Sequence, residues 1–539
     1  MSHHQLRKYT SSSPRSDSNG HGIKPFYITT PIFYVNAAPH IGHLYTMILA
    51  DTLKRWRTHY DGHPALLCTG TDEHGLKVQH AALSAREEPK AFVDKSAMKF
   101  KDLAASANID YNRFIRTTDP DHIQVAQKMW RILADRGYIY KGQHSGWYCV
   151  SDETFYPETQ VEKALNESGE EIVISKETGK KVEWTSEENY FFALSKFQDK
   201  LLQHLRLNED FIKPTQWYDF IKREVESGLP DLSISRPTTR CNWGVPVPED
   251  GSQLMYVWLE ALVNYVTFSG RLSDDQPLPN CWPADIQIIG KDIVRFHTIY
   301  WPAFLLAAGL ELPRTVAVHS HWTIEGAKMS KSTGNVVDPF ETMLNYGRDS
   351  VRFFLLHDGH LDHDTPYSSE RLIERHNTLL VNKFGNLIMR VCGPKFDLPA
   401  ALANKEVPDA LKSPHEELVS SANSLINEMD SEVNALSTSR ALGKAIDLVT
   451  RGNAYLQEHE PWTHSPQSIE RLTIIKDGAE LARVSAIALQ PFIPELASDC
   501  LDRLNVDVTK RSFKFAKYGA DLDYGQHTNR KGDPPLIKL

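Results

Sequence analysis

Two histidines at a turn are the first residues whose types and spacing could do chemistry. The segment NAAPHIGHLY, residues 36–45, places His40 and His43 on either side of Gly42, just before a helical pattern. Unpaired N–H groups and the dipole at a helix N-terminus favour anions, so imidazole N–H groups there could donate to phosphate oxygens. Gly42 would let a flat base approach the backbone. Zinc ligation would need further Cys or His residues nearby, which are missing, and packed core histidines stay the alternative.

A second candidate is the segment KMSKSTGN, residues 328–335, in which two lysines and three hydroxyl side chains lie close together. This composition is typical of a cationic loop that binds phosphate, or of an ordinary solvated surface loop. The sequence contains neither a GxxxxGK[ST] P-loop nor a GxGxxG fingerprint. Any nucleotide must therefore be held by other means.

The elements that position these segments follow from hydrophobic patterns. Residues 26–35 and the run PALLCTGTD, residues 64–72, predict buried strands, and residues 44–61 between them predict a helix that ends before Gly62. This order predicts a parallel βαβ unit whose ligands lie at the carboxyl ends of the strands. The pattern stops near residue 140 and resumes with DIQIIG and TVAVHS, so the sheet is predicted to be split by an insertion.

The C-terminal third of the chain predicts an all-α bundle. After about residue 365 strand signals end, and apolar residues recur at helical spacing. The predicted buried stripes are Leu380, Phe384, Leu387, Val391; Leu418, Ala422, Leu425, Met429, Val433; and Leu472, Ile475, Ala479. Proline-containing loops are expected near 394–414 and 461–466.

Composition limits the class of protein. The chain has 539 residues, 41% of them hydrophobic and 24% charged, which is ordinary for a globular protein with several packed units. No apolar run is long enough to span a membrane. Six cysteines without a CxxC pair fit a reducing compartment and predict no zinc site. The net charge of −9 gives no support for nucleic-acid binding, although a basic stripe can lie on an acidic protein. The Ser-rich, acid-poor residues 1–24 fit a transit peptide or a disordered tail.

PHIGH and KMSKS, on opposite halves of one split sheet, form a specific pair that resembles the class I aminoacyl-tRNA synthetases. Further blocks narrow the resemblance to the methionyl-tRNA synthetases: TTPIFYVNAAPHIGHLY, TGTDEHG, MYVWLEALVNY, IIGKDIVRFHTIYWP and GAKMSKSTGNVVDP. The resemblance covers residues 25–539.

This resemblance implies an α/β fold: a split Rossmann-like (HUP-type) parallel-sheet catalytic domain with a connective-peptide insertion, followed by an all-α anticodon-binding helical bundle. The implied divisions are a leader or transit peptide at 1–24, the first Rossmann half at 25–140, an insertion without a zinc knuckle at 141–215, the second half at 216–325, the KMSKS loop and stem-contact region at 326–365, and the anticodon-binding domain with a C-terminal tail at 366–539.

The resemblance also implies the activity and its residues. Methionine would be activated with ATP and Mg²⁺ and transferred to tRNA(Met), with His40, His43, Lys328 and Lys331 as the catalytic groups. The implied ATP-binding residues are Pro39, His40, Gly42, His43, Gly290, Lys291, Asp292, Lys328, Met329, Ser330, Lys331 and Ser332. The implied methionine-binding residues are Pro31, Ile32, Tyr34, Asp72, Trp258, Leu262, Tyr265, Ile293 and His297. Asp72 would pair with the α-ammonium, and the Tyr265 hydroxyl and the Ile32 N–H would approach the thioether.

The implied anticodon contacts are Asn386, Arg390 and Trp462, with the Trp ring stacking on an unstacked base. The resemblance further implies a metal-free insertion, cyclisation of misactivated homocysteine in the synthetic site, and a monomer without a membrane partner. With the leader, it favours the mitochondrial matrix over the cytoplasm.

Three other functions stay open at this point. The first is a class I synthetase for another amino acid. The second is a small-molecule nucleotidyltransferase, which also uses an HxGH turn but would leave residues 366–530 unexplained. The third is a non-catalytic tRNA-binding module, against which the intact candidate residues count: His40, His43, Asp72, Trp258 and Lys331.

Overall fold

The chain forms two compact units, and each is described by itself. The structure, a computed structural model, describes residues 24–149, 154–156, 158–166, 169–176, 178–272, 280–324, 327–328, 336–526 and 534–539. The first unit comprises residues 1–39, 66–104 and 110–319, and the second comprises residues 40–65, 105–109 and 320–539. The expected leader therefore lies almost wholly outside the described residues, and so do Met329, Ser330, Lys331 and Ser332.

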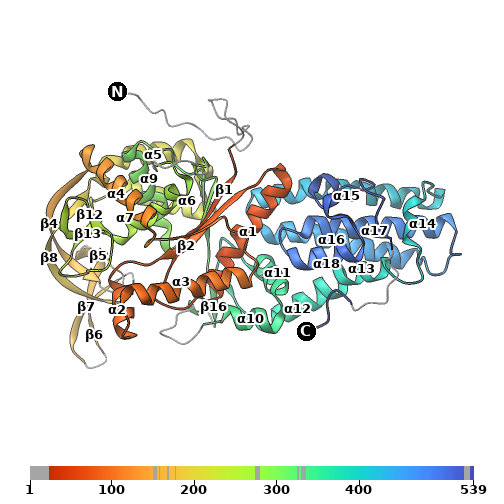
Figure 1. Ribbon diagram of the computed structural model, residues 1–539, viewed down its shortest axis with the longest axis horizontal. Helices are drawn as coiled ribbons and strands as arrows, with labels where there is room; N and C mark the ends of the chain where they lie inside the picture. The colour runs from red at the N-terminus through yellow and green to blue at the C-terminus, as the bar shows by residue number, and fades with distance from the viewer. Residues whose placement is uncertain are drawn as a thin grey trace. The chain divides into compact units, whose positions relative to one another are not determined.

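A six-stranded parallel sheet organises the first unit (Figure 1). Its order is β3-β2-β1-β14-β15-β9, and all neighbouring strands in it are parallel. The strands are β1 (Tyr27–Tyr34), β2 (Leu66–Asp72), β3 (Arg113–Arg116), β9 (Ile212–Lys213), β14 (Ile286–Gly290) and β15 (Thr315–His319). The two predicted halves thus join in one sheet between β1 and β14. The edge strand β9 comes from residues expected in the insertion, because a strand of two residues leaves no periodic signal.

Strand β1 changes register beside its partner β2. The register of the pairing shifts between Thr29 and Ile32, around Pro31. Proline has no N–H to give to a ladder, so it is found at bulges rather than in regular central strands. The Thr30 hydroxyl oxygen lies 2.8 Å from the Pro31 carbonyl oxygen and 2.7 Å from the Thr69 hydroxyl, so it can donate to one and accept from the other. The last residues of β1 are therefore re-aimed just before the strand reaches its carboxyl end.

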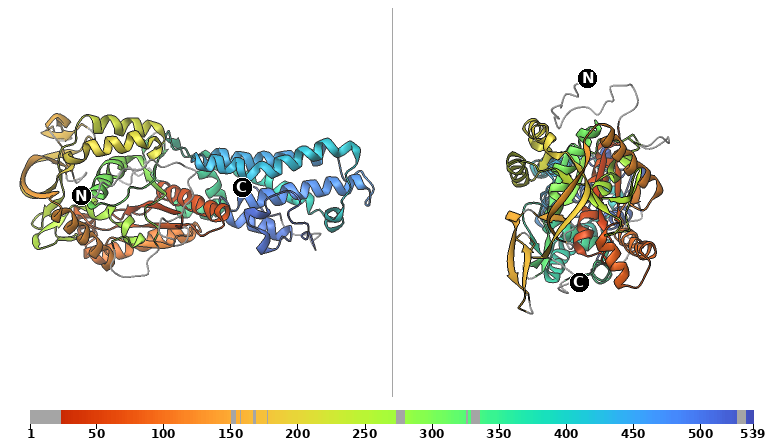
Figure 2. Two further views of the ribbon diagram at one scale, coloured as in Figure 1. Left: turned by 90° about the horizontal axis from the view of Figure 1, so that it is seen from above. Right: turned by 90° about the vertical axis from the view of Figure 1, so that its left-hand side faces the viewer.

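The insertion folds as a separate antiparallel sheet with the order β5-β4-β8-β7-β6. Its long strands β4 (Ile139–Cys149) and β8 (Lys181–Phe192) form the curved ribbon in Figure 2, and β6 (Val161–Leu165) pairs with β7 (Glu171–Ser175) as a projecting hairpin. The remaining strands of the first unit are β5 (Thr154–Tyr156), β10 (Leu232–Ser233), β11 (Ser235–Pro237), β12 (Pro246–Val247) and β13 (Asp250–Met255).

Helices and buried apolar side chains complete the first unit. One apolar core includes Met129, Phe192 and Trp301, all nearly inaccessible to solvent. The helices of this unit are α2 (Leu76–Ser84), α3 (Pro89–Ser106), α4 (Pro120–Asp135), α5 (Gln198–Leu207), α6 (Thr215–Glu226), α7 (Val257–Leu262), α8 (Asn264–Ser269) and α9 (Trp301–Ala308), and those from α4 onward contribute to this core.

The second unit begins with helix α1 (Ile41–Asp61), which has the predicted bounds to within a few residues. Its apolar residues Leu44, Ile48, Leu53 and Trp56 are buried, and Gly62 caps the helix in the left-handed conformation with φ 70°. A small sheet of order β17-β16-β18 follows, built from β16 (Trp322–Ile324), β17 (Ala327–Lys328) and β18 (Thr365–Pro366).

The rest of the described second unit is helical, as predicted. Helices α15, α16 and α17 run side by side in Figures 1 and 2. Short helix α14 and the start of α15 fall within the region expected to be a loop near 394–414. The loop prediction there was wrong because Asp397 caps α14 by accepting a hydrogen bond from the Ala400 N–H at 3.0 Å. The helices are α10 (Pro339–Tyr346), α11 (Arg348–Asp358), α12 (Ser369–Arg375), a π-helical segment (His376–Gly385), α13 (Asn386–Val391), α14 (Leu398–Ala403), α15 (Lys412–Asn434), α16 (Thr438–Glu458), α17 (Ile469–Leu489) and α18 (Pro494–Arg503).

The predicted stripes of the bundle lie in its interior, with Leu472 alone only partly buried. No helix within the described residues combines the length and apolar character that crossing a membrane would require.

Candidate functional site

His40 and His43 together cap helix α1. The His40 backbone is extended, and its Nδ1 accepts the Gly42 N–H at 3.1 Å, while His43 Nδ1 accepts the His40 N–H at 3.1 Å. The two rings stack with centroids 3.8 Å apart. A Cβ at position 42 would lie 2.9 Å from the His40 ring, so the glycine makes room for this capping ring. In this structure, the space beside Gly42 is therefore filled by the His40 ring that caps the helix.

The cap fixes which ring nitrogens carry protons. Because Nδ1 of each histidine accepts a backbone N–H, each neutral ring holds its proton on Nε2. The first turn of α1 contains no acidic residue, so the positive end of the helix dipole is not neutralised there by its own side chains. Two Nε2–H donors at such a helix start suit an anionic ligand, which supports the phosphate interpretation.

The carboxyl ends of the central strands gather the other predicted groups in the first unit. Tyr34 ends β1, Asp72 ends β2 opposite it, and Gly290 ends β14. Lys291 and Asp292 continue directly from β14 in a short 3₁₀ turn. Asp72 is only 5% exposed, so its carboxylate is largely shielded from water.

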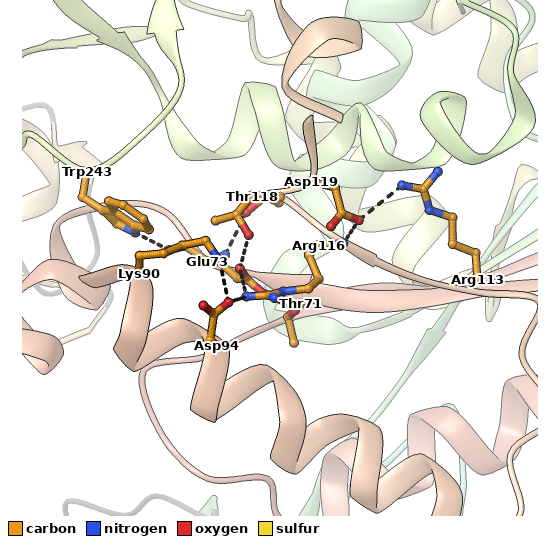
Figure 3. A network of polar contacts seen from close by, with 10 residues as sticks. Thr71, Glu73, Lys90, Asp94, Arg113, Arg116, Thr118, Asp119 and Trp243 are labelled. Atoms are coloured by element: carbon orange, nitrogen blue, oxygen red, sulfur yellow. Dashed lines mark hydrogen bonds and ion pairs between the residues drawn. The ribbon is translucent and has the colours of Figure 1, made fainter. Parts of the chain in front are cut away.

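A network of charges holds the residue that follows Asp72 (Figure 3). Oε1 of Glu73 accepts from Arg116 Nε and from the Thr71 hydroxyl, each at 2.6 Å. Oε2 accepts from Arg116 Nη2 at 2.8 Å and from the Thr118 hydroxyl at 2.6 Å. The Glu73 carbonyl accepts the Trp243 indole N–H at 2.6 Å. Burial lowers the pKa of Arg116, but its hydrogen bonds to Glu73 and Asp94 raise the pKa by more, so it lies above its ordinary value. This network is absent from the sequence prediction and anchors the backbone at Asp72.

Aromatic residues from α7 and from the segment after β14 lie against each other. The Trp258 ring, predicted to line a pocket, stacks on Phe296 with centroids 3.7 Å apart. Phe296 was missed, although its place beside His297 in RFHTIYWP was available as a signal. Ile32 and Ile293 pack partly buried against the same apolar core, and Leu262 is fully buried in it.

Tyr265 and His297 form a buried hydrogen-bonded pair. His297 Nδ1 lies 3.0 Å from the Ile293 carbonyl and so carries the proton, which leaves Nε2 to accept the Tyr265 hydroxyl at 2.7 Å. Burial lowers the pKa of His297 to about 4, so the ring is neutral at physiological pH. In this arrangement the Tyr265 proton is donated to His297 and is not directed to a ligand.

In the second unit, the predicted anticodon residues Asn386 and Arg390 lie on α13, and Trp462 lies in the turn after α16, where it faces Arg390. Asn386 donates to the Asn453 side-chain oxygen at 2.8 Å, and Arg390 donates to the Asn453 carbonyl at 3.1 Å and to Gln457 Oε1 at 3.2 Å. The Arg390 guanidinium lies 5.4 Å from the centre of the Trp462 ring, which is 43% exposed. Asn453 and Gln457 on α16 were not predicted. The arrangement presents an exposed ring beside a held cation, which suits stacking on a base.

The lone insertion cysteine is a core residue. Cys149 is buried in a small apolar cluster with Tyr156 and Val182. Within the described part of the chain, one group of three potential metal ligands was found, His360, Asp362 and His363 of the second unit, and two of these three are exposed. Lys328 lies in β17, and its side chain is outside the described atoms.

Comparisons with known proteins agree with this geometry. Residues 26–392 match the family model described as tRNA synthetases class I (M), and residues 407–530 match the anticodon binding domain of methionyl tRNA ligase. The chain is 44% identical to a probable mitochondrial methionine–tRNA ligase of Neurospora crassa, over 96% of this chain and 85% of that protein. It is 43% identical to the mitochondrial enzyme of Candida albicans, over 96% of each. A Mycobacterium tuberculosis methionyl-tRNA synthetase in complex with methionyl-adenylate is 39% identical, has a TM-score of 0.84, and matches 92% of this chain and 96% of that one.

Proposed function

The chain belongs to the methionyl-tRNA synthetases of class I, and from that premise we propose how its residues divide the work of methionine–tRNA ligation. In the first step a carboxylate oxygen of methionine attacks the α-phosphorus of ATP, a C–O–P bond forms, and pyrophosphate leaves. In the second step a ribose hydroxyl at the 3′ end of tRNA(Met) attacks the acyl carbon, AMP leaves, and the hydroxyl proton is released. No enzyme nucleophile is required, so positioning and electrostatics carry the catalysis.

The ATP phosphates are assigned to the start of α1 and to the KMSKS segment. His40 and His43 donate from Nε2 to oxygens of the α-phosphate, whose charge grows in the transition state. Lys328 and Lys331 neutralise the β- and γ-phosphates of ATP, which enters as its Mg²⁺ complex, and Met329, Ser330 and Ser332 belong to the same loop. Pro39 and Gly42 shape the turn, and Gly290, Lys291 and Asp292 face the nucleoside.

Methionine is assigned to the carboxyl ends of β1 and β2. The observation that carries this proposal is the buried Asp72 carboxylate beside Tyr34, a position that suits an α-ammonium ion. Trp258, Leu262, Ile293 and His297, with Pro31 and Ile32 of the bulged strand, form the walls for the thioether side chain. Tyr265 donates to His297 in the described state, so it contacts sulfur only if that hydrogen bond is exchanged.

Transfer specificity is assigned to the second unit. Trp462 stacks on a base of the CAU anticodon, while Asn386 and Arg390 contact base edges. Misactivated homocysteine, one methylene shorter than methionine and poorly excluded by fit alone, is cyclised in the synthetic site. Mixing enzyme, ATP and homocysteine should yield the thiolactone, and its absence would contradict this route.

The chain works in mitochondria, as the names of its relatives from Neurospora crassa, Candida albicans and human indicate. The partners we propose are L-methionine, ATP and tRNA(Met), with the protein acting as a monomer and its insertion free of zinc. Elemental analysis and sedimentation of the purified protein test the last two points.

The deciding experiment is amino-acid-dependent ATP–pyrophosphate exchange across all twenty amino acids without tRNA. Exchange with methionine alone, lost in His43→Ala and Lys331→Ala but kept in the surface variant Lys200→Ala, supports the assignment. Exchange with another amino acid would move the pocket assignment to another synthetase. No exchange with any amino acid would favour a nucleotidyltransferase or a binding module.

A further inference from the structure

Glu260, in helix α7, is a fully buried acid that the assignments above leave unused. Its Oε1 lies 3.1 Å from His74 Nδ1, and its Oε2 lies 3.2 Å from His122 Nε2. A buried carboxylate without partners is strongly unfavourable, and even a paired one is often no more stable than an apolar residue of the same size. A stability role alone therefore explains this His–Glu–His cluster poorly.

The cluster joins the segments that carry the two sides of the proposed methionine pocket. His74 follows Asp72 by two positions on the loop after β2, and its carbonyl accepts the Tyr34 hydroxyl at 3.0 Å. Glu260 follows Trp258 by two positions on α7, and Trp258 stacks on Phe296. One carboxylate thus connects the loop of the ammonium-binding acid to the helix of the aromatic wall.

The hydrogen bonds indicate the charge state of the cluster. Burial raises the pKa of Glu260, but the charges and hydrogen bonds of His74 and His122 lower it more, so the carboxylate stays ionised. Towards this ionised carboxylate both rings donate, His74 from Nδ1 and His122 from Nε2. The Thr267 hydroxyl lies 3.4 Å from the other ring nitrogen of His122 and holds the ring in place.

We propose that Glu260 is a positioning residue for methionine: through His74 and His122 it fixes the Asp72 loop against the Trp258 helix. The inference rests on the proposed function of that pocket. It concerns the amino-acid substrate and not ATP, because neither His74 nor Glu260 contributes to the start of α1 or the KMSKS segment.

The variant that tests this is Glu260→Gln, which keeps the shape and removes the charge. In this variant the amide NH₂ group faces the N–H donor of one of the two histidines, so the hydrogen bond to that histidine is lost. Losing one hydrogen bond to a buried charged group loosens the loop and helix that form the two sides of the pocket, so we expect the KM for methionine to rise by about 10- to 100-fold. The KM for ATP should stay within about twofold, and the methionine dissociation constant from equilibrium dialysis without ATP should rise with the methionine KM.

A matched control separates positioning from folding. Asp285 is also buried and accepts from the Lys24 ammonium and the Tyr27 N–H, each at 2.8 Å, but it lies at the amino end of β14. Asp285→Asn should lower the thermal unfolding midpoint while leaving the methionine KM unchanged. If Glu260→Gln behaves like Asp285→Asn, with lower stability and an unchanged methionine KM, Glu260 is only structural and the inference is wrong.

A pair of histidine variants keeps the test decisive if Glu260→Gln does not fold. The Nε2–H of glutamine can stand in for that of His122, whereas leucine cannot donate. His122→Gln should keep the methionine KM near the wild-type value, and His122→Leu should raise it; equal KM values in the two variants would overturn the inference. Wild-type protein without methionine-dependent exchange would instead refute the proposed function itself, so the two failures are distinguishable.

Discussion

Replacing Glu73 by glutamine should loosen the loop that carries Asp72. The carboxylate accepts four hydrogen bonds, two of them from the Arg116 guanidinium and two from threonine hydroxyls. In Glu73→Gln one oxygen becomes an NH₂ group that faces two donors, so two of the four bonds are lost together with the charge. Each hydrogen bond to a charged group is worth about 1.5–3 kcal/mol, and breaking a buried ion pair typically costs about 3–5 kcal/mol.

Hydrogen-exchange mass spectrometry is the suitable assay because it reports the local opening free energy in a chain of two units. Amides of β2 and β3 should exchange about a hundredfold to a few thousandfold faster in Glu73→Gln, the equivalent of about 3–5 kcal/mol. The matched control is Asp94→Asn, which removes the charge of a carboxylate that accepts from the same arginine at 2.5 Å but is 45% exposed. An exposed pair contributes about 0–1 kcal/mol, so this control should accelerate exchange by less than about fivefold.

A double-mutant cycle with Arg116→Met completes the argument. The double variant should lose less than the sum of the single variants, because removing both partners leaves no unpaired buried charge. Strict additivity, or equal effects of Glu73→Gln and Asp94→Asn, would refute the claim that burial makes the Glu73–Arg116 pair dominant.

Three further outcomes are expected. His43→Asn keeps an acceptor where Nδ1 lies but lacks the Nε2–H, so pyrophosphate exchange should fall about 10- to 100-fold while the α1 cap survives. His43→Ala should lose both the cap and the exchange activity. Normal exchange in His43→Asn would contradict donation from His43 to phosphate. Trp462→Ala should lower kcat/KM for tRNA aminoacylation by about 10- to 100-fold, which is the contribution of one stacked base. Pyrophosphate exchange should not change, and a loss of exchange would show that the effect is not confined to tRNA. The hydrogen bond from His415 to Asp477, at 2.9 Å, raises the pKa of His415, so its stabilisation is complete below about pH 6.5 and is lost as pH rises through the folded pKa. The difference in unfolding midpoint between wild type and His415→Gln should therefore shrink from pH 6 to pH 9, and a difference that grows over this range would be evidence against the pairing.

The sequence allowed the elements with strong local patterns to be predicted. The strand at 26–35, the helix ending before Gly62 and the strand ending at Asp72 match β1, α1 and β2, because burial of one face imposes a period that is visible within a single segment. Motifs in the turns after these strands placed His40, His43 and Asp72 as candidates, since parallel strands gather ligand contacts at their carboxyl ends.

Contacts between distant segments could not be predicted in the same way. Arg116 meets Glu73 from another strand, and Glu260 meets His74 across an even longer separation, so no local period relates the partners. The stacking of Phe296 on Trp258 and the hydrogen bond between Asn386 and Asn453 also join residues that are far apart in the sequence. Such pairs depend on how elements pack, and a single sequence does not encode packing in any short window.

The pairing of the acids around Asp72 bears on how the site selects its substrate. Glu73 is held by Arg116 and two hydroxyls, and Glu260 is held by two imidazoles. Because each of these acids is hydrogen-bonded within the protein, we expect neither to compete with Asp72 for the ammonium ion that we propose Asp72 binds. Removing either compensating partner would leave a second buried negative charge near the pocket and would draw cations to the wrong place. We therefore expect variants of Arg116 or His122 that lack donors to bind methionine less selectively against simple alkyl ammonium ions, a competition that equilibrium dialysis can measure directly.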